Sequence, residues 1–481
     1  MNEYNFKTEF QLIVTAILLL TLNWYSQASV SVNEKKLFKA GAATANITPP
    51  LGMAIVGGWG NPEAIHIHDE LHARCLVLDD GSTKLVFVVV DNVHLRSDLL
   101  DEARKRIMDD TDIPVTNILI SSTHTHSAVS GSGKGSDSFD EYQKFLLSRF
   151  VDVVKIAINN MEPAKIGWGS VDVPEHLFVR RWKMKPGTPM PNPYGGEDKV
   201  VMNPGRSPNL LEQAGVPDPE VSFLSIQSKE GRPIALLANY SLHYVGWIPT
   251  GHVSADYFAV FADRIQGLIG ADRQDPPFVG IMSNGTSGDV SNIDFSSPRW
   301  DKEPYEQMYY VANDVANKVF GVYGEIQYQD WLELGAATEI LSLSVRKVPK
   351  RLIRRSEEVL ARPDTVEPIH RHEVTYARRI LSLNQMPDKI DITLQAFRIG
   401  SFGIAAIPFE VFAETGLEIK ERSPFERSFT IELANGAFGY LPTPEQHKLG
   451  GYETWYGTNK VEEDASVKIV DRLMKLFNSL K

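Results

Sequence analysis

Short apolar segments alternate with longer amphipathic segments along this chain, and this alternation limits the folds that it can adopt. Residues 84–90 (KLVFVVV) are rich in β-branched side chains, which is typical of a strand buried on both faces. Residues 97–111 then have the spacing of a helix. Because the same order recurs further along, the sequence predicts an α/β fold, with a mixed β-sheet core and flanking helices.

The recurrences extend over most of the chain. Three further strands are predicted at residues 117–121, 233–239 and 278–282. Helices are predicted to follow them near residues 141–161, 256–269 and 305–322. Residues 390–407 have the pattern of a hairpin that turns at Gly400, and residues 465–480 that of an amphipathic helix.

Composition excludes several classes of protein. The 481 residues are 43% hydrophobic and 23% charged, as expected of a globular chain. The 49 basic and 61 acidic residues give a net charge of −12, which argues against a nucleic-acid partner because such binding depends on Lys and Arg at phosphates. Cys75 is the only cysteine, so neither an intramolecular disulfide nor a thiol zinc finger can form.

The N-terminus has the pattern of an export signal. Residues 12–22 are apolar, but this run is too short to cross about 30 Å of hydrocarbon. Ser26 and Ala28 place small side chains at the −3 and −1 positions of a cleavage site. We therefore predict a signal peptide over residues 1–28 and a periplasmic or extracellular protein, with an uncleaved anchor as the alternative. Residues 29–481 are expected to form a single domain, with a long surface loop over residues 183–219.

Candidate metal ligands follow three of the apolar strands. His124 and His126 come after the strand at 117–121, His243 follows the strand at 233–239, and Glu410 follows the second arm of the late hairpin. The ligand crevice of an open α/β sheet lies beyond the carboxyl ends of its strands. Two histidines and one glutamate are sufficient to hold zinc with one coordination position open. Taken singly, each residue has an ordinary explanation: a surface loop, a core histidine, or a carboxylate at a helix N-terminus.

Several motifs together resemble the neutral/alkaline, non-lysosomal ceramidases. They are the segments at 40–50 (AGAATANITPP), 122–127 (STHTHS), 288–291 (GDVS) and 408–410 (PFE), which occur in the family's order. Members of that family are zinc amidases that cleave the N-acyl bond of ceramide. The resemblance implies their catalytic domain, without the β-sandwich-like domain that follows it in ceramidases.

The resemblance also implies roles for individual residues. Four residues correspond to the family's zinc ligands: His124, His243, Glu410 and Tyr440. Four more correspond to residues that act on the substrate: His126 in the second coordination sphere, Tyr452 and Arg180 at the reacting carbonyl, and Ser291 as nucleophile or hydrogen-bond donor. Arg181 fits the arginine position nearly as well as Arg180.

Two departures from the family pattern bear on the substrate. Ala128 and Asn292 stand where the family has the start of Gly-Pro-Gly-Gly and of Pro-Asn, respectively. The expected function is an exported zinc-dependent hydrolase that cleaves an N-acyl amide of a ceramide-like lipid by attack of metal-activated water, in contact with a membrane surface. The alternatives are a zinc esterase or deacylase acting on an acylated glycan or another small molecule, and a non-catalytic binding protein with a structural metal. The sequence does not indicate an oligomeric state.

Overall fold

The computed structural model describes residues 36–58, 60–131, 139–298, 301–363 and 365–481. The chain divides into two compact units, Met1–Leu37 and Phe38–Lys481, and the fold described below is that of the second. The predicted signal peptide at residues 1–28 lies outside the described residues.

An eight-stranded mixed sheet forms the centre of this unit, in the order β16-β14-β13-β8-β1-β4-β5-β6. The strands are β1 (Lys39–Asn46), β4 (His72–Asp79), β5 (Lys84–Val90), β6 (Ile118–Ser122), β8 (Glu162–Asp172), β13 (Glu220–Ser228), β14 (Pro233–Tyr240) and β16 (Val279–Asn284). Strands β1 and β8 pair only near their first residues, through two residue pairs, so the sheet consists of two four-stranded halves joined at one corner. Each half contains one parallel pair, β5 with β6 and β14 with β16.

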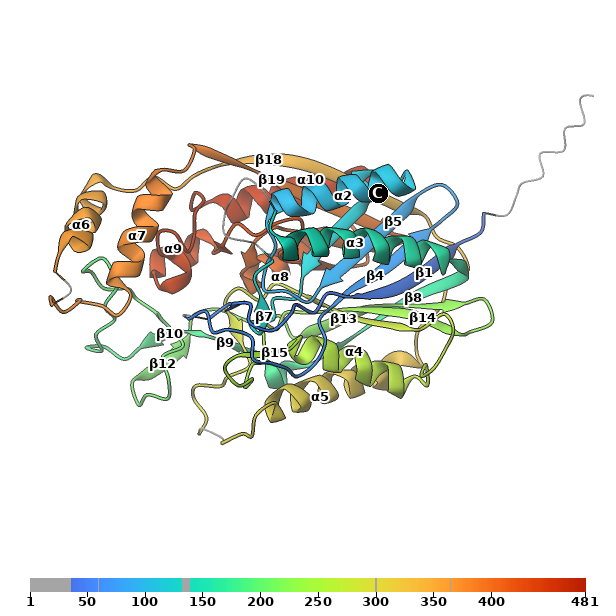
Figure 1. Ribbon diagram of the computed structural model, residues 1–481, viewed down its shortest axis with the longest axis horizontal. Coiled ribbons are helices and arrows are strands. Elements are labelled where there is room, and N and C mark those ends of the chain that lie inside the picture. Colours follow the sequence, from blue (N-terminus) through green and yellow to red (C-terminus); the bar gives the residue numbers. More distant parts are fainter. Residues whose placement is uncertain (1–35, 59, 132–138, 299–300, 364) are drawn as a thin grey trace, which may run out of the picture. The chain divides into compact units, whose positions relative to one another are not determined.

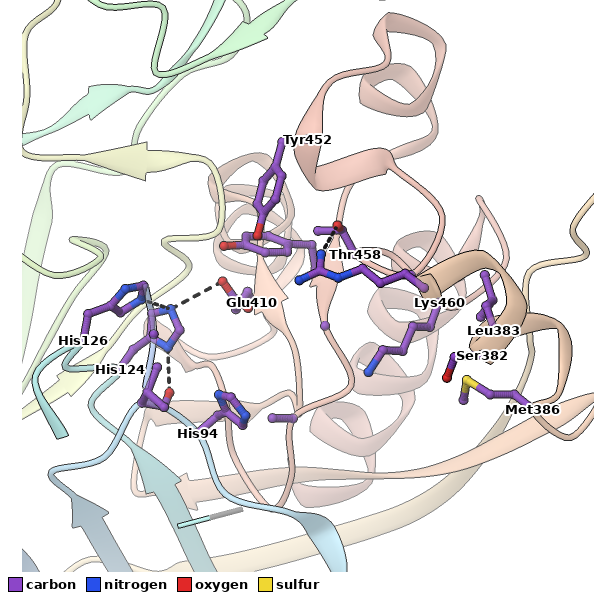
Figure 2. Close-up of a pocket in the computed structure, with 17 residues that line it drawn as sticks. His94, His124, His126, Ser382, Leu383, Met386, Glu410, Tyr452, Thr458 and Lys460 are labelled. Atoms are coloured by element: carbon purple, nitrogen blue, oxygen red, sulfur yellow. Dashed lines mark hydrogen bonds and ion pairs between the residues drawn. The ribbon is translucent and has the colours of Figure 1, made fainter. Parts of the chain in front are cut away.

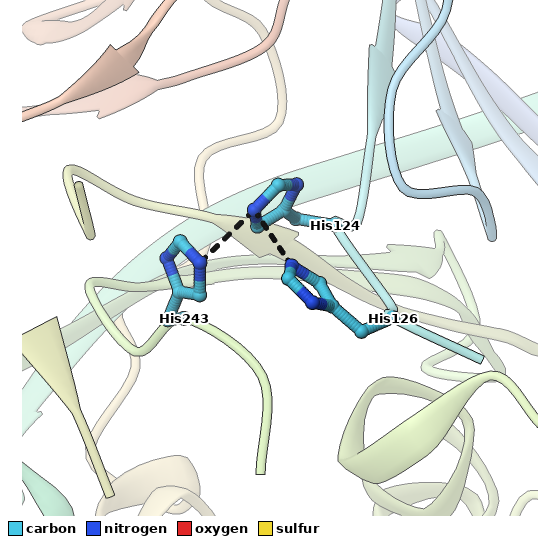
Figure 3. A group of neighbouring side chains, drawn as sticks. All are labelled: His124, His126 and His243. Carbon is cyan, nitrogen blue, oxygen red and sulfur yellow. Dashed lines mark hydrogen bonds between the residues drawn. The ribbon is translucent and has the colours of Figure 1, made fainter. Parts of the chain in front are cut away.

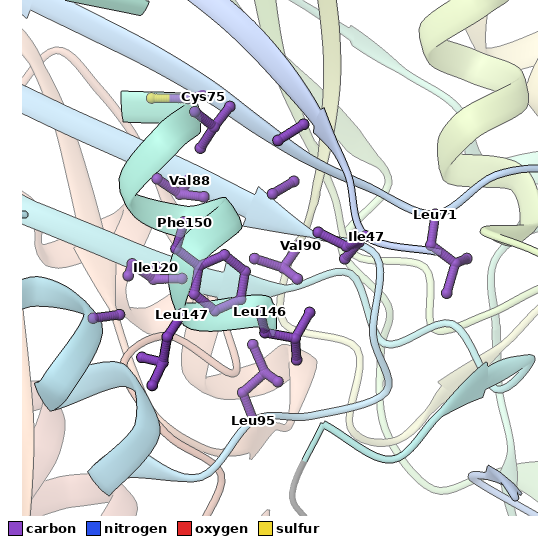
Figure 4. Close-up of a cluster of buried hydrophobic side chains, with 14 of the residues drawn as sticks. Ile47, Leu71, Cys75, Val88, Val90, Leu95, Ile120, Leu146, Leu147 and Phe150 are labelled. Carbon is purple, nitrogen blue, oxygen red and sulfur yellow. The ribbon is translucent and has the colours of Figure 1, made fainter. Parts of the chain in front are cut away.

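Helices cover one face of each half (Figure 1). They are α2 (Ser97–Thr111), α3 (Glu141–Asn159), α4 (Asp256–Leu268) and α5 (Glu306–Tyr323). Successive residues of a strand point to opposite faces, so Val88 and Val90 of β5 pack with Phe150 of α3, as Figure 4 shows, whereas Phe87 packs on the other side. Fully buried strands explain why β5 is apolar at consecutive positions rather than at alternate ones.

A second sheet packs on the other face of the first. Its order is β18-β19-β20-β22, and its strands are β18 (Leu334–Ser344), β19 (Lys389–Ile399), β20 (Phe402–Ala406) and β22 (Arg427–Ile431). Phe397 and Ile404 share a buried cluster with Phe87 and Leu224 of the first sheet. The remaining face of the second sheet packs against α8 (Ala413–Arg422) and α10 (Ala465–Leu480). The unit is thus a four-layer arrangement of helices, sheet, sheet and helices.

A helical hairpin connects β18 to β19 of the second sheet. It consists of α6 (Lys350–Ala361) and α7 (Glu373–Asn384), which lie beside each other in Figure 1. The two strands pair along their whole length, from Leu334 with Ile399 to Ser344 with Lys389. The hairpin is therefore an excursion from a continuous ladder, and its second helix lines the cavity described below.

Short elements complete the unit. They are β2 (Ile55–Val56), β3 (His66–Ile67), β7 (Ala128–Val129), β9 (Phe178–Val179), β10 (Arg181–Met184), β11 (Val201–Met202), β12 (Leu210–Gln213), β15 (His252–Val253), β17 (Val290–Ser291), β21 (Glu410–Val411), β23 (Tyr440–Leu441) and α9 (Pro444–Leu449), with 3₁₀ helices η1 (Val115–Asn117), η2 (Pro174–His176) and η3 (Tyr452–Thr454). The prediction of an irregular loop over residues 183–219 was wrong in part, because β11 and β12 pair with β10 in a small sheet.

The expected fold class is confirmed: mixed sheets form the core and helices cover them. Each predicted strand and helix is present, with bounds that differ by a few residues at most. No helix in the described part of the chain combines the length and apolarity that a membrane span needs.

Candidate metal centre

The histidines and the glutamate predicted as ligands meet at one point, although they come from distant parts of the sequence. His124 and His126 follow β6, His243 follows β14, and Glu410 follows β20. The Nε2 atom of His124 lies 3.0 Å from Nε2 of His243 and 3.2 Å from Nε2 of His126 (Figure 3). Oε2 of Glu410 lies 3.4 Å from Nε2 of His124 and 4.0 Å from Nε2 of His243. Each residue thus directs a ligand atom at a common centre.

Backbone carbonyls fix the orientation of all three imidazole rings. Nδ1 of His124 donates to the Val93 carbonyl at 2.6 Å, and Nδ1 of His243 donates to the Ser287 carbonyl at 3.1 Å. The His126 ring donates to the carbonyl of Gly57. Because the ring proton is used in these bonds, the nitrogens at the centre present unprotonated lone pairs. Metal-binding histidines are typically oriented in this way.

The arrangement fits a metal cation. Lone pairs this close repel unless a proton or a cation lies between them. Four ligand atoms of a tetrahedral site, each about 2.0–2.1 Å from zinc, lie about 3.3 Å apart. The separations among the ligand atoms of His124, His243 and Glu410, which run from 3.0 to 4.0 Å, bracket that value. Oε2 of Glu410 is buried and accepts no hydrogen bond from the described residues, so a carboxylate lone pair is also left for a cation.

Burial and mutual charge oppose a fully protonated cluster. Burial disfavours the charged form of His124, but Glu410 outweighs it and raises the pKa of His124 above its usual value. Burial, followed by the charge of His124, lowers the pKa of His126 and His243 well below theirs. Burial would raise the pKa of Glu410, yet His124 outweighs this effect and lowers it. His126 and His243 are therefore neutral beside the Glu410 carboxylate, and these are the forms that bind a metal, while the positive charge favoured at His124 is one that a bound cation can replace.

Tyr440 lies beside the Glu410 carboxylate. The short strands β21 and β23 pair in parallel, with Glu410 opposite Tyr440, so both side chains start from one ladder position. The Tyr440 phenol interacts with Glu410 and with the guanidinium of Arg180, whose central carbon lies 5.4 Å from the Tyr440 ring centroid. Burial raises the pKa of Tyr440 well above its usual value, so the phenol keeps its proton at neutral pH.

The structure separates the two candidate arginines. Arg180 donates through Nε to Glu453 at 3.0 Å and through Nη2 to the Gly288 carbonyl at 2.8 Å, and it faces Tyr440. Arg181 donates to the other oxygen of Glu453 at 2.6 Å, to Gln446 and to the Gly450 carbonyl. Its guanidinium stacks on Phe412 rather than on a residue of the metal centre. Arg180 is therefore the arginine next to the candidate ligands.

A cavity of about 460 Å³ opens onto the metal centre (Figure 2). Its metal-side wall includes Gly57, His124, His126, Glu410, Tyr440 and Tyr452. Its α7-side wall includes Arg379, Ser382, Leu383, Met386, Thr458 and Lys460. The ring of Tyr452 meets that of Tyr440 edge-on at 5.7 Å between centroids. The volume is within the range of small-molecule sites.

Ser291 is not among the described residues that line this cavity. It lies in β17, opposite Phe178 of β9, and its hydroxyl oxygen accepts a hydrogen bond from the Ile293 amide at 3.3 Å. The nearby carboxylate of Asp289 accepts from the amide of Ala413 at the start of α8, so Asp289 ties the loop to that helix. His243 and Arg180 are also absent from the lining, but they contact His124 and Tyr440, respectively, whereas Ser291 has no hydrogen bond to a candidate ligand among the described residues.

Known proteins resemble this chain in sequence and in fold. No protein-family profile matches the chain. Neutral ceramidase B of Dictyostelium discoideum is 23% identical in an alignment of 314 residues that covers 60% of this chain and 41% of that protein. The crystal structure of neutral ceramidase from Pseudomonas aeruginosa superposes with a TM-score of 0.65 at 15% identity, over 93% of this chain and 75% of that chain. A structure described as ceramidase complexed with C2 gives a TM-score of 0.68 at 14% identity, with the same coverage of both chains.

The chain is related to the neutral ceramidases. The family resemblance expected from the sequence motifs is thereby confirmed. The structural matches show a shared fold, and the sequence match spans about two fifths of the curated relative.

Sequence reasoning missed a second layer of residues around the metal centre of this ceramidase relative. The Ser287 hydroxyl accepts from Nδ1 of His243 at 3.2 Å and donates to Glu432 at 2.6 Å. Glu432 is fully buried after β22 and also accepts from the Val411 amide at 2.7 Å. Burial raises its pKa to about 8 in spite of the hydrogen bond from Ser287. Its position just after the end of a strand could have identified it from the sequence, because His243 and Glu410 also follow strand ends.

Two backbone features also position the ligands. His124 has a φ of 73°, a left-handed conformation that is uncommon for residues other than glycine, and its amide donates to the Asn92 carbonyl at 2.9 Å. Gly57 has a φ of 117°, and a Cβ there would lie 2.8 Å from Cγ of His126. A glycine is therefore required for the close approach that lets its carbonyl hold the His126 ring. On its other face His126 stacks on Tyr244, with ring centroids 3.8 Å apart.

Proposed function

We propose that this chain is a zinc-dependent amide hydrolase that cleaves the N-acyl bond of a ceramide-like lipid. The observation that carries the proposal is the convergence of three imidazole nitrogens and one carboxylate oxygen at the wall of a cavity. The relation to neutral ceramidases supports the choice of an amide bond and an acyl lipid.

Zinc is the metal that this donor set suits best. Imidazole nitrogens and a carboxylate are typical zinc ligands, whereas magnesium and calcium prefer a shell of oxygens. We assign His124, His243, Glu410 and Tyr440 as ligands, with His126 at the edge of the coordination sphere. When bound, zinc polarises a carbonyl and lowers the pKa of water toward 7.

The chain's own residues would stabilise the charge that develops on the acyl oxygen. Arg180 is held by Glu453 and by the Gly288 carbonyl, so its positive charge is fixed beside Tyr440 before substrate binds. Tyr452, which lines the cavity beside Tyr440, would present its phenolic proton to that oxygen. Donors fixed in advance cost no reorganisation during the reaction, and loss of one typically lowers the rate by about 10²- to 10³-fold.

Water rather than Ser291 is the proposed nucleophile. A serine nucleophile needs a base within hydrogen-bond distance, whereas the Ser291 hydroxyl accepts a hydrogen bond from the Ile293 amide and has no hydrogen bond to a basic side chain among the described residues. Mass spectrometry of protein quenched during turnover tests this assignment. An acyl group on Ser291 would show that the serine attacks the substrate, whereas its absence at every time point is expected.

The N-terminal pattern supports export as part of the proposal. Cleavage after Ala28 would release a periplasmic or extracellular enzyme. Mass spectrometry of the protein recovered from culture medium or from a periplasmic fraction would give the new N-terminus. Recovery of the intact chain from the cytosol would contradict this part of the proposal.

The central experiment combines metal content with substrate class. We expect about one zinc per chain, which is lost in Glu410→Gln and retained in Glu421→Gln, a matched change at an exposed residue of α8. The same preparations are assayed with acyl-labelled ceramide, with simple N-acyl amines and with a panel of acylated sugars. Cleavage of the amides is the expected result. Cleavage of the sugars alone would favour an esterase or deacylase, and metal retention in Glu410→Gln would overturn the metal assignment.

A further inference from the structure

The α7-side wall of the cavity carries positive charge that a neutral ceramide would not use. Lys460 is half-buried there, and no carboxylate of the described residues lies within ion-pair distance of its ammonium group. Figure 2 shows this side chain reaching into the cavity from the side opposite His124 and His126. A partly desolvated ammonium without an anionic partner loses hydration that its surroundings do not replace.

A second cation lies on the same wall. Arg379 of α7 donates through Nη1 to the hydroxyl groups of Tyr376 at 3.0 Å and Thr458 at 3.2 Å. Arg379 and burial both act to lower the pKa of Lys460, burial being the larger effect, while Glu410 acts in the opposite direction. That carboxylate faces the imidazoles, so its charge is shared with the metal centre.

The wall is rigidly built, so these charges hold their place. The hydroxyl of Tyr376 bonds to Thr458, which joins α7 to the segment carrying Lys460. Gly457 has a φ of 90°, and a Cβ there would lie 2.7 Å from Cβ of Arg379, so this glycine allows the two segments to touch. A preorganised pair of cations is a typical arrangement for binding carboxylate or phosphate.

We propose that the substrate is an N-acyl amine that carries an anionic group, a carboxylate or a phosphate ester, close to its amide, and that Lys460 and Arg379 bind this group. The inference rests on the proposed amide hydrolysis and narrows its substrate class. The hydroxyl groups of ceramide offer Lys460 only neutral hydrogen bonds, whereas an anion offers charge-assisted ones in a partly desolvated site. Zinc at the metal centre, together with Arg180, would add to the attraction of an anionic substrate.

Matched substrates test this inference. N-octanoylglycine and N-octanoylglycinamide differ only in a carboxylate against a neutral amide, and ceramide 1-phosphate and ceramide differ in a phosphate ester. We expect kcat/KM of the zinc-loaded protein to be at least about tenfold higher for the anionic member of one pair. The pair that shows the preference identifies the carboxylate or the phosphate as the anion.

Variants at position 460 test whether the α7-side wall causes the preference for the anionic substrate. Lys460→Met is expected to lower kcat/KM by about 10- to 100-fold on the preferred anionic substrate and by less than about threefold on its neutral partner. Lys460→Arg should restore most of the loss. Lys475→Met, a matched change at an exposed residue of α10, should leave both values unchanged. Equal or better cleavage of the neutral substrates would overturn the inference while leaving amide hydrolysis intact.

Binding gives a second measurement that does not depend on turnover. Calorimetry on the zinc-loaded protein is expected to show tighter binding of N-octanoylglycine or ceramide 1-phosphate than of the neutral partner, and Lys460→Met should abolish the difference. If no amide is cleaved, the proposed function fails, but these dissociation constants still decide whether the wall selects anions. Equal constants within each pair would refute the inference.

Discussion

The two walls of the cavity are built differently, and the contrast separates chemistry from recognition. On the metal-side wall, each imidazole has one nitrogen held by a backbone carbonyl and the other directed at the common centre. On the α7-side wall, Lys460 faces the cavity without a carboxylate partner among the described residues, and Arg379 bonds to neutral hydroxyls. The first wall is suited to a resident cation and the second to an anion that arrives with the substrate.

The largest expected effect is the loss of a ligand from the metal centre behind the metal-side wall. His243→Ala removes one of the converging nitrogens, so bound zinc should be lost, and hydrolysis of neutral and anionic substrates should fall together by at least about 10³-fold. Atomic emission of the purified variant gives its metal content, and initial rates give its activity. A variant that kept both metal and activity would show that His243 is not a ligand.

A smaller effect is expected one layer behind that wall. Ser287→Ala removes the hydroxyl between His243 and Glu432, so zinc affinity should weaken by about 10- to 100-fold while excess zinc restores most of the activity. Competition with a fluorescent zinc chelator measures this affinity. Ser382→Ala, on the α7-side wall, is the control and should leave affinity unchanged. Equal affinities in all three proteins would remove Ser287 from the metal site.

Changes in the α7-side wall should alter the preference for anionic substrates and leave zinc binding unchanged. Arg379→Met is expected to lower kcat/KM by about tenfold on the preferred anionic substrate, with bound zinc unchanged and little effect on the neutral partner. Arg378→Met, at the exposed neighbouring position of α7, is the matched control. Because Arg379 also bonds to Thr458, a thermal melt of each variant checks that the wall is intact. A loss shared by both substrates would instead indicate a purely structural role.

The smallest expected effect concerns stability and pH. The pKa of Glu432 is raised by burial from 4.5 to about 8, so its contribution to stability is present below about pH 4.5 and is lost as the pH rises toward 8. The side-chain amide introduced by Glu432→Gln cannot titrate. The free energy of unfolding of the variant should therefore rise relative to that of the wild type as the pH increases, by at most about 1.4 kcal/mol per pH unit.

Thermal melts of both proteins in chelator, from about pH 5 to about pH 8, measure this difference. Glu358→Gln, at an exposed residue of α6, should show no such trend. A constant difference between Glu432→Gln and wild type across this range would mean that Glu432 titrates normally.

Elements with an uninterrupted apolar pattern could be predicted from sequence, and those with an interrupted pattern could not. Strand β5 and helices α2 and α10 have the predicted bounds, because their apolar spacing is continuous and clear. Strand β8 (EPAKIGWGSVD) was missed, since glycines interrupt its pattern. Gly167 is needed there, because a Cβ would lie 2.4 Å from the side chain of Ile326. Such a requirement depends on a neighbour that is distant in sequence.

The candidate site divides along the same line. His124, His243 and Glu410 could be predicted because each directly follows a recognisable strand and matches a family motif. Lys460 lies in a loop and Arg379 in a helix, and neither segment has a distinguishing sequence pattern. Only the folded chain brings the two residues to the same cavity wall. Glu432 lies between these cases: it follows β22, which was not predicted as a strand.

The helical hairpin α6–α7 leaves and rejoins the second sheet between two strands that pair with each other over their whole length. Its replacement would leave that ladder and the strand ends that carry the candidate ligands in place, while changing the side chains that α7 presents to the cavity. The hairpin is thus a separable insertion: grafting a different one onto the same two strands would reshape one side of the binding space without disturbing the metal centre.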